Sequence, residues 1–571
     1  MPSRDWQVHE FDARLARSLT DSFSLPPLIG RLLVQRGISD CGAVDRFLNP
    51  SLEQLHDPFR LTDFTKTTDR LIAAVQRKER IVVHGDYDVD GVTSTVMVSR
   101  LLELLGANVC YYIPNRLSDG HGLRPESVEL LGDEGAQVIV SVDCGIRSVE
   151  AADRAALLGI DLIVTDHHEP GPKLPNAFSI INPRLAGSNY PEMNLSGAGV
   201  AFKLVQGLCQ RTGHEPWLSG FVKLAAIGTV ADVVPLQGEN RVIVKLGLDQ
   251  LSSGPNSAGL DALIDVAGLV GKSIDSENVA FGLVPRLNAA GRMASADLAA
   301  RLLLTTDTAS KSEAFMLARK LDELNTQRQK VQRDVFMMAQ EMIEADSKIK
   351  SHEVMVIAGV GWHRGVIGIV ASKLVEIFGK PTIVLSIEGD VAHGSGRSTP
   401  DFDLLGALNR CSQLFTQFGG HRMAAGVTLE ATKIAALQEC LNMYRDGGLR
   451  EGHETAILHI DAPLEIKELS TELISGINRL RPFGRGNPEP VFQANGVKLV
   501  ERPKLLNNQH LAMSLNQDGH VFRAIAWRSA HRKDFLRGLG DEIDVVYSLM
   551  ENHFRGKSTV QLSIADVREA R

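Results

Sequence analysis

The stretch Arg80-Ile-Val-Val-His-Gly-Asp-Tyr-Asp-Val-Asp-Gly91 joins a short apolar run to three aspartates at alternate positions. The apolar run predicts a buried strand, and the apolar spacing over residues 93–105 predicts that a helix follows. Extended backbone would send Asp86, Asp88 and Asp90 to one side, where their repulsion would be costly without a counter-ion. Because Mg²⁺ and Mn²⁺ prefer carboxylate oxygen, the stretch predicts a metal-binding turn at the end of a strand.

Two further strand ends carry side chains of the same kind. The apolar run 138–142 precedes Asp143, and the run 162–164 precedes Thr165-Asp166-His167-His168. Short apolar runs that alternate with amphipathic helices predict βαβ units and a buried parallel sheet. The carboxyl ends of parallel strands meet at one edge, where ligands bind. A helix N-cap would explain one of the aspartates but not two adjacent imidazoles, so the sequence predicts a single converging site.

A fourth acid, Asp232, lies in the apolar, helix-like segment 225–235. A carboxylate without a partner in such a segment loses several kcal/mol of hydration. Considered alone, the segment favours an ion pair with a nearby arginine such as Arg241. Beside the other acids, metal ligation is the better interpretation.

Composition limits the possible functions. A chain of 571 residues is long enough for about four domains. The 61 basic and 69 acidic residues give a net charge of −8, which argues against a protein that coats nucleic acid or anionic membrane. The 6 cysteines form no CxxC pair, so neither a thiolate zinc site nor a disulfide framework is expected. No secretory apolar region follows Met1 and no apolar run approaches the ~20 residues of a membrane span, so we expect a cytoplasmic protein.

Residues 306–350 have apolar side chains spaced alternately four and three apart. The positions are Leu317, Leu321, Leu324, Arg328, Val331, Val335, Met338 and Met342, so one charged residue interrupts the seam. A long amphipathic helix packed on a domain explains this pattern better than a dimeric coiled coil. We expect a rigid connector of about 40 Å between two lobes.

Five segments follow from these patterns. They are a helical cap over residues 1–50, an α/β domain over 51–305, the connector helix over 306–350, a second α/β domain over 351–455 and a small all-β barrel over 456–571.

Several motifs carry a family resemblance. HGDYDVDG (84–91), SVDCG (141–145), TDHH (165–168) and GTVADVVPL (228–236) resemble, in order and spacing, four motifs of the DHH phosphoesterase superfamily. LNAAGR (287–292), GWHRGVIGIVASKL (361–374), GSGRS (394–398) and FGGHRMAAG (418–426) resemble its DHH-associated lobe, and RPFGRGNPEPVF (481–492) resembles the start of an OB domain. The chain is therefore identified as a member of the superfamily's bacterial single-strand-specific 5′→3′ DNA exonucleases. The resemblance implies two α/β lobes, a DHH parallel-sheet domain and a DHH-associated domain, joined by a long helix, plus a C-terminal OB-type β-barrel.

The resemblance also implies roles for residues in the first four motifs. It implies that two divalent ions, Mn²⁺ or Mg²⁺, are held by Asp88, Asp90, Asp143, His167 and Asp232, with Asp143 bridging them and His84 ligating or supporting the first. Asp86 and Asp166 would orient ligands, and His168 would face the scissile phosphate. The implied reaction is two-metal-ion hydrolysis of phosphodiester bonds, which releases 5′-mononucleotides in DNA repair and recombination.

Other residues are candidates for binding DNA. The glycine runs of GSGRS and GGH are typical of tight turns, but their backbone N–H groups would also suit an anion. With the resemblance, Arg116, Arg292, Ser395, Arg397 and His421 become candidates for gripping the 5′-terminal and neighbouring phosphates. Residues 471–540 contain 11 basic and 5 acidic residues. There Phe522 and Trp527, with Phe554 further on, are stacking platforms or barrel core.

Three alternatives remain open at the level of sequence. They are a phosphodiesterase for short oligonucleotides or cyclic dinucleotides, a replication scaffold on the same fold, and a zinc hydrolase, which the aspartate-rich ligand set disfavours. The resemblance implies single-stranded DNA with a 5′ end as substrate. It also implies cooperation with single-stranded DNA-binding protein and a RecQ-type helicase, by a monomer without a membrane partner.

Overall fold

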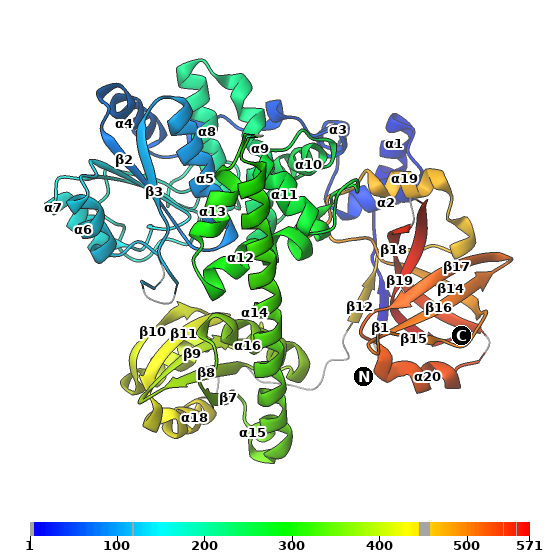
Figure 1. Ribbon diagram of the computed structural model, residues 1–571. Helices are drawn as coiled ribbons and strands as arrows, with labels where there is room; N and C mark the ends of the chain where they lie inside the picture. The colour runs from blue at the N-terminus through cyan, green and yellow to red at the C-terminus, as the bar shows by residue number, and fades with distance from the viewer. Residues whose placement is uncertain are drawn as a thin grey trace. The chain divides into compact units, whose positions relative to one another are not determined.

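The computed structural model describes residues 5–116, 119–120, 122–307, 309–444, 457–540, 542–554 and 557–570 (Figure 1). The chain forms two compact units. The larger unit comprises His56–Val234 and Leu246–Glu451, and the smaller unit comprises Met1–Leu55, Pro235–Lys245 and Gly452–Arg571.

The first sheet of the larger unit is entirely parallel. Its strands run in the order β3 (Asn108–Tyr112), β2 (Arg80–Gly85), β4 (Val138–Val142), β5 (Asp161–Thr165) and β6 (Ser179–Ile181). Ile81, Val82 and Val83 are fully buried, as expected for a sheet covered on both faces. The three predicted strand ends, after β2, β4 and β5, therefore lie next to one another at one edge.

Helices surround this sheet and extend the larger unit. They are α4 (Phe64–Arg77), α5 (Val89–Leu104), α6 (Pro125–Asp133), α7 (Val149–Leu157), α8 (Gly197–Thr212), α9 (Leu218–Ala231), α10 (Gly238–Ser253), α11 (Ala258–Val266), α12 (Val284–Met293) and α13 (Asp297–Leu304). Helix α10 begins in the smaller unit and ends in the larger one. Helices α5, α8 and α9 pack on one another and are apolar on nearly all sides, which explains their deep burial.

Helix α14 (Lys311–Ala345) is the predicted connector, and Figure 1 shows it passing beside both α12 and α16 (Arg364–Phe378). Leu317, Leu321 and Leu324 are buried as the heptad predicts. The prediction is wrong further along, where Met338 and Met342 are 42% and 40% exposed. There the buried side chains are Val335, Phe336, Ala339 and Ile343. A straight helix drifts by about 20° per heptad, so a strict seven-residue seam leaves the buried face.

The second sheet of the larger unit is mixed. Its order is β10 (Phe415–His421), β11 (Ala424–Glu430), β9 (Val391–Arg397), β8 (Thr382–Glu388) and β7 (Met355–Val360), and β7 and β8 form its parallel pair. The accompanying helices are α15 (Ser347–Ser351), α16 (Arg364–Phe378), α17 (Leu404–Arg410) and α18 (Ile434–Met443).

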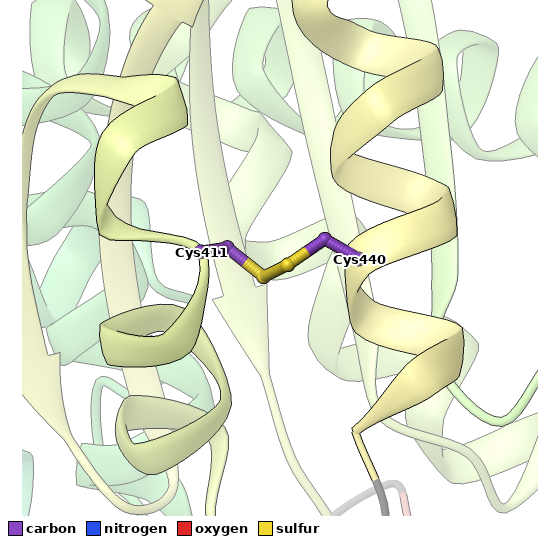
Figure 2. Close-up of a disulfide and its surroundings, with 2 residues drawn as sticks. All are labelled: Cys411 and Cys440. Carbon is purple, nitrogen blue, oxygen red and sulfur yellow. A yellow bond between two sulfur atoms is a disulfide. The ribbon is translucent and has the colours of Figure 1, made fainter.

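A disulfide joins Cys411, just after α17, to Cys440 in α18 (Figure 2). The sequence predicted no disulfide framework, because its 6 cysteines are scattered. These two are 29 residues apart and meet only because both helices pack against the second sheet. The pairing depends on tertiary structure and has no local signal.

The smaller unit contains a closed barrel, as the sequence predicts. Five strands pair in a ring, and the last strand pairs with the first. Their order is β14 (Phe492–Leu499), β18 (Glu542–Phe554), β19 (Lys557–Glu569), β17 (His520–Ala526) and β16 (His510–Gln517), and β16 pairs with β14. Five further elements complete this part of the chain. They are the strands β12 (Ile457–Ile460), β13 (Ala462–Pro463) and β15 (Lys504–Leu506) and the helices α19 (Thr471–Asn478) and α20 (Lys533–Gly538).

The N-terminal segment shares the core of the barrel. It consists of β1 (Asp5–Val8), α1 (Ala13–Phe23), α2 (Pro27–Gln35) and α3 (Cys41–Leu48). Leu32 and Leu33 of α2 belong to one apolar cluster with Phe492 and Tyr547 of the barrel, and β1 pairs in parallel with β12. Among the described helices, none combines the length and hydropathy that crossing a bilayer requires.

Candidate active site

The turn between β2 and α5 holds the first three acids. Asp88 is the N-cap of α5, and its Oδ1 accepts hydrogen bonds from the backbone N–H groups of Asp90 and Gly91 at 3.0 and 3.1 Å. A Cβ atom on Gly91 would lie 2.5 Å from the carbonyl oxygen of Asp86, so only glycine lets the first turn of α5 pass so close. The turn therefore presents Asp86, Asp88 and Asp90 from a rigid backbone.

The buried carboxylate of Asp90 rests on the N-terminus of α8. Its Oδ2 accepts from the N–H of Gly197 and its Oδ1 from the N–H of Ala198, both at 2.7 Å. The positive end of the helix dipole partly offsets the carboxylate charge. Gly197 also lies against Asp143, since a Cβ there would be 2.4 Å from Asp143 Oδ1.

Asp143 follows β4 in the left-handed backbone region, with φ of 59°. Its N–H donates to the carbonyl oxygen of Thr165 at 3.0 Å, which extends the sheet by one residue and turns the side chain into the site. The side chain is buried. A buried carboxylate in a sparsely populated conformation persists only where the surroundings hold it, which is typical of a functional position.

Asp166 organises the histidine pair. It accepts hydrogen bonds from the backbone N–H groups of Ile146, His167 and His168, and its Oδ1 lies 2.7 Å from His168 Nδ1. The pKa of Asp166 is lower than its usual value. Burial alone would raise it, but the hydrogen bond and the charge of His168, together with the backbone N–H donors, outweigh that effect. The same contact raises the pKa of His168 against the effect of burial. The His168 side chain is 48% exposed, so its ring is accessible from the solvent side.

His167 lies at the centre of the acids. Its Nε2 is 3.2 Å from Asp143 Oδ1 and 3.8 Å from Asp90 Oδ2, and its Nδ1 is 3.6 Å from Asp232 Oδ2. Burial, followed by the charge of His168, lowers the pKa of His167 to about 4. The ring is therefore neutral at pH 7, which is the form that ligates metal ions.

Three groups of side chains lie close enough together to share a metal ion. Within each group the ligand atoms lie within 4.8 Å of one another, and the groups are Asp143 with His167 and His168, Asp90 with His167 and Asp232, and Asp86 with Asp88 and Asp143. The structure thus brings together Asp86, Asp88, Asp90, Asp143, His167, His168 and Asp232. Asp86, which the sequence predicts to orient ligands, belongs to the last of these groups.

The electrostatics of the site fit divalent cations. Burial, then the charges of Asp232 and Asp88, raise the pKa of Asp90 well above its usual value. The pKa of Asp143 is also raised well above its usual value, first by burial and then by the charges of Asp90, Asp88, Asp86 and Asp232. Asp143 Oδ1 and His167 Nε2 are both buried and lie 3.2 Å apart, but neither makes a hydrogen bond within the described part of the chain. Buried, mutually repelling oxygen ligands beside a neutral imidazole are suited to Mn²⁺ or Mg²⁺.

Two predicted residues lie at the edge of these groups or outside them. His84 belongs to none of the three groups, although its Nε2 is buried without a hydrogen-bond partner in the described part of the chain. Burial lowers the pKa of His84 to about 4, against the charge of Asp86. Arg241, the alternative partner of Asp232, stacks on the Phe47 ring and donates to the carbonyl oxygens of Phe47 and Arg481.

The predicted phosphate-binding loop GSGRS is instead part of the central strand β9. Its backbone pairs with β8 on one side and with β11 on the other, so its N–H groups are not arranged as a turn for an anion. A Cβ on Gly394 would lie 2.5 Å from Leu385, and one on Gly396 would lie 2.8 Å from Leu404. These glycines therefore serve the packing of the sheet.

The side chains of Ser395 and Arg397 remain available on the other face of β9. Arg397 Nη1 donates to Ser395 Oγ at 3.0 Å and to the Gly396 carbonyl oxygen at 2.7 Å. Helix α16 passes close by, since a Cβ on Gly368 would lie 2.9 Å from Ser395 Oγ. Burial, then the charge of Arg116, lowers the pKa of Arg397.

The remaining side chains predicted to bind phosphates come from both lobes of the larger unit. Arg116 lies over the ring of Tyr87, with its guanidinium carbon 5.0 Å from the ring centre. Arg292 at the end of α12 donates to the carbonyl oxygen of Gly365 at 3.1 Å. His421 is exposed on the edge strand β10, and burial of its ring followed by the charges of Arg397, Arg147 and His168 lowers its pKa. His421 thus lies within electrostatic range of residues from both lobes.

Some supporting residues were missed by the sequence reasoning. Gly197 and Ala198 hold Asp90, and Asn288 Oδ1 accepts the N–H of Val89 at 3.2 Å. The glycine-rich start of α8 could have indicated close backbone approach, and Asn288 lies inside the quoted LNAAGR motif. Neither signal names a partner, because the partners are distant in sequence.

Family models match three parts of the chain. Residues 80–229 match the DHH family N-terminal domain, residues 351–445 the DHHA1 domain and residues 460–566 the RecJ OB domain. Together with the acid and histidine cluster, these matches define a DHH-type phosphoesterase with an added OB barrel.

The chain is 36% identical to the single-stranded-DNA-specific exonuclease RecJ of Bacillus subtilis, over 98% of this chain and 70% of the relative. It is 34% identical to RecJ of Escherichia coli, over 95% of this chain and 96% of the relative. The chain belongs to the RecJ family.

Solved structures agree with this assignment. RecJ of Thermus thermophilus in complex with Mn²⁺ superposes with a TM-score of 0.83 at 30% identity, covering 99% of this chain and 80% of that one. The same protein in complex with Mg²⁺ gives a TM-score of 0.75 at 28% identity, covering 99% of this chain and 79% of that one.

Proposed function

We propose that this protein degrades single-stranded DNA from the 5′ end, releasing 5′-mononucleotides by metal-dependent hydrolysis of phosphodiester bonds. Membership of the RecJ family makes it a single-stranded-DNA-specific exonuclease. The observation that carries the further proposal is the placement of two kinds of group in one unit. Carboxylates and imidazoles suited to cations lie at one sheet edge, and guanidiniums suited to phosphates come from both lobes.

We assign metal binding to Asp88, Asp90, Asp143, His167 and Asp232, with Asp86 as a further ligand and His84 as a supporting group. The chemistry that two divalent ions supply is polarisation of phosphoryl oxygen and activation of water. The protein contributes a fixed, buried set of acceptors, so little reorganisation is needed when charge builds up on the phosphate.

His168 has a distinct role in this proposal. Asp166 holds its Nδ1, so the proton on Nε2 is directed away from that contact. The raised pKa of His168 favours the protonated ring. From the exposed side of the cluster, Nε2 can donate a hydrogen bond to a phosphoryl oxygen or to the leaving oxygen.

The second lobe is proposed to bind the 5′ end of the strand and so to set the direction of degradation. Ser395, Arg397 and His421 offer a hydroxyl, a guanidinium and an imidazole that suit a terminal phosphate, which carries more charge than an internal diester. A group that holds the strand end at a fixed distance from the acids would make each cleavage release one nucleotide. Arg116 and Arg292 would then contact phosphates nearer the cleaved bond.

The barrel is proposed to bind single-stranded DNA, and Trp527 is the candidate side chain on which a base would stack. Its side chain is 43% exposed and lies edge-on to His510 with ring centres 4.9 Å apart. Phe522 packs against the barrel core instead, and the side chain of Phe554 is outside the described part of the structure. Exposed aromatic rings beside basic residues suit stacking of successive bases.

The partners also remain proposals. We expect a cytoplasmic monomer that works with single-stranded DNA-binding protein and a RecQ-type helicase in DNA repair and recombination. Pull-down of each partner with the purified chain, with and without DNA, tests this expectation.

A labelled-end assay tests the proposed polarity. With Mn²⁺, the wild-type protein should release a labelled mononucleotide at once from 5′-labelled single strands, and only late from 3′-labelled ones. Arg397→Ala should lose about tenfold in preference for a 5′-phosphate over a 5′-hydroxyl end, the effect of one charge-assisted contact. Arg422→Ala, which changes a nearby exposed arginine, is the control. Early release from the 3′ label, or an unchanged preference in Arg397→Ala, would contradict the proposal.

A further inference from the structure

The interruption of the α14 seam at Arg328 is the feature that the proposed function leaves unexplained. Arg328 follows buried Leu324 by one turn and precedes half-buried Val331 by three residues, so it lies on the inner face of the helix. A charged side chain among apolar neighbours costs hydration unless it has a partner. An apolar residue would extend the seam without that cost.

The contacts of Arg328 do not compensate its charge. Its Nη2 donates to Asn325 Oδ1 at 2.7 Å and its Nη1 to Gln332 Oε1 at 3.1 Å, and both partners are neutral amides of the same helix. Its Nε is buried and has no hydrogen-bond partner among the described residues. Asn325 is itself buried. The two amides thus hold a guanidinium in place but leave it uncompensated.

The position of Arg328 along α14 is between the two lobes. In the N-terminal half of α14, Asp322 pairs with Arg286 of α12 and Glu313 pairs with Arg301 of α13, so this half lies on the first lobe. Figure 1 shows α14 beside α16. Side chains from the C-terminal half of α14 form an apolar cluster with α16 and β7, and Val331 and Met293 pack against it. Met293 is the neighbour of Arg292 in α12, so the inner face of α14 at this point approaches the Arg292 end of α12.

Arg292 and Arg397 both lie against the first turns of α16. Arg292 Nη1 donates to the Gly365 carbonyl oxygen at 3.1 Å, and a Cβ on Gly368 would lie 3.1 Å from Arg397 Nη2. After burial, the charge of Arg116 lowers the pKa of Arg397. After burial, the charges of Arg116 and then Arg328 lower the pKa of Arg292 to about 10, and the nearby charge of Asp88 opposes them. Each guanidinium of the series Arg397, Arg116, Arg292 and Arg328, called the row below, thus lies within electrostatic range of the next. Neighbouring positive charges of this kind raise the local concentration of anions, as a path for a polyanion requires.

We propose that Arg328, held by Asn325 and Gln332, binds a backbone phosphate of single-stranded DNA on the 3′ side of the cleaved bond, which makes α14 a wall of the DNA path. The inference rests on the proposed function, because Arg397 at the opposite end of the row is assigned to the 5′-terminal phosphate. If one nucleotide lies between that end and the cleaved bond, the phosphate at Arg328 belongs to the strand that remains.

Binding without cleavage is the first test. Fluorescence anisotropy in EDTA, with a 5′-phosphorylated dodecamer, compares wild type with Arg328→Ala, Arg328→Lys and Arg333→Ala. Arg333 is an exposed arginine of the same helix and gives the matched change in charge. Arg328→Ala should bind about tenfold more weakly, and the slope of log K against log salt should fall by about 0.7, as expected for one lost phosphate contact. Arg328→Lys should restore the slope, and Arg333→Ala should match wild type.

Hydrolysis of a short substrate is the second test. A 5′-phosphorylated dinucleotide, which ends one nucleotide beyond the cleaved bond, has no phosphate for Arg328. Its kcat/KM should be unchanged in Arg328→Ala, whereas KM for the dodecamer should rise. An unchanged salt slope would overturn the inference, and so would equal losses for both substrates. Failure of the proposed function would look different, since the wild-type protein itself would then release no nucleotide from the 5′ end.

Discussion

At the scale of single residues, the site is a set of carboxylates held against their own repulsion. Asp143 is the clearest case, because burial and four neighbouring aspartates raise its pKa well above the usual value. In the absence of a cation this arrangement destabilises the fold. The residue types and their order could be predicted from sequence, since Asp86, Asp143 and Asp166 each follow an apolar strand. Their mutual distances could not, because these depend on φ of 59° at Asp143 and on Gly197 from another helix.

Replacing Asp143 by asparagine separates chemistry from stability. Asn has the same shape, so it fits against Gly197, but it removes one charge and a candidate bridging ligand. We expect Asp143→Asn to lower exonuclease turnover by at least about 10³-fold, comparable with loss of a main electrostatic contact in a catalytic site. In EDTA the variant should melt above wild type, and its affinity for single strands should not fall. Turnover near the wild-type rate would contradict the assignment of Asp143.

At the scale of elements, the sequence predicted strand ends better than glycine function. The runs before Asp143 and Asp166 are β4 and β5, because continuous apolar segments have few alternatives in a covered parallel sheet. GSGRS was assigned to an anion-binding turn and is a central strand, because glycine also permits close packing in a sheet, as at Gly394 against Leu385. The sequence of α8 gave no sign that its N-terminus would receive Asp90, since that contact joins residues 107 apart.

The N-terminus of α8 offers a test of element placement. A methyl group in Gly197→Ala would meet Asp143 Oδ1 at 2.4 Å and must displace either the carboxylate or the helix. We expect activity to fall by at least about tenfold and the Mn²⁺ concentration for half-maximal rate to rise, as when a residue supporting a metal ligand is changed. Gly220→Ala in α9 is the control, because a Cβ there meets nothing within 4 Å. A helical alanine at position 220 should be neutral or stabilise by about 0.5–1 kcal/mol. Equal effects of the two substitutions would contradict the proposed role of Gly197.

At the scale of the whole molecule, the distribution of charge matters more than its total. The net charge of −8 includes Asp86, Asp88, Asp90, Asp143 and Asp232, which the structure gathers in one cluster. Two divalent ions would add four positive charges there and bring −8 to −4. The excess of 11 basic over 5 acidic residues in 471–540 lies in the smaller unit. The acidic total therefore argues against indiscriminate binding of nucleic acid and is compatible with a nuclease.

The division into two units predicts how metal ions affect unfolding. All candidate ligands lie in the larger unit, whereas the barrel and the N-terminal helices share a separate core in the smaller one. A ligand that binds only the folded state stabilises it by about 2.7 kcal/mol at a hundredfold excess over Kd. Calorimetry should therefore show one transition that Mn²⁺ moves to higher temperature and EDTA moves back, and a second that neither changes. In Asp143→Asn the first transition should respond less to Mn²⁺, while Trp527→Ala should leave that response intact. A shift of both transitions by Mn²⁺ in the wild-type protein would contradict a cation site confined to the larger unit.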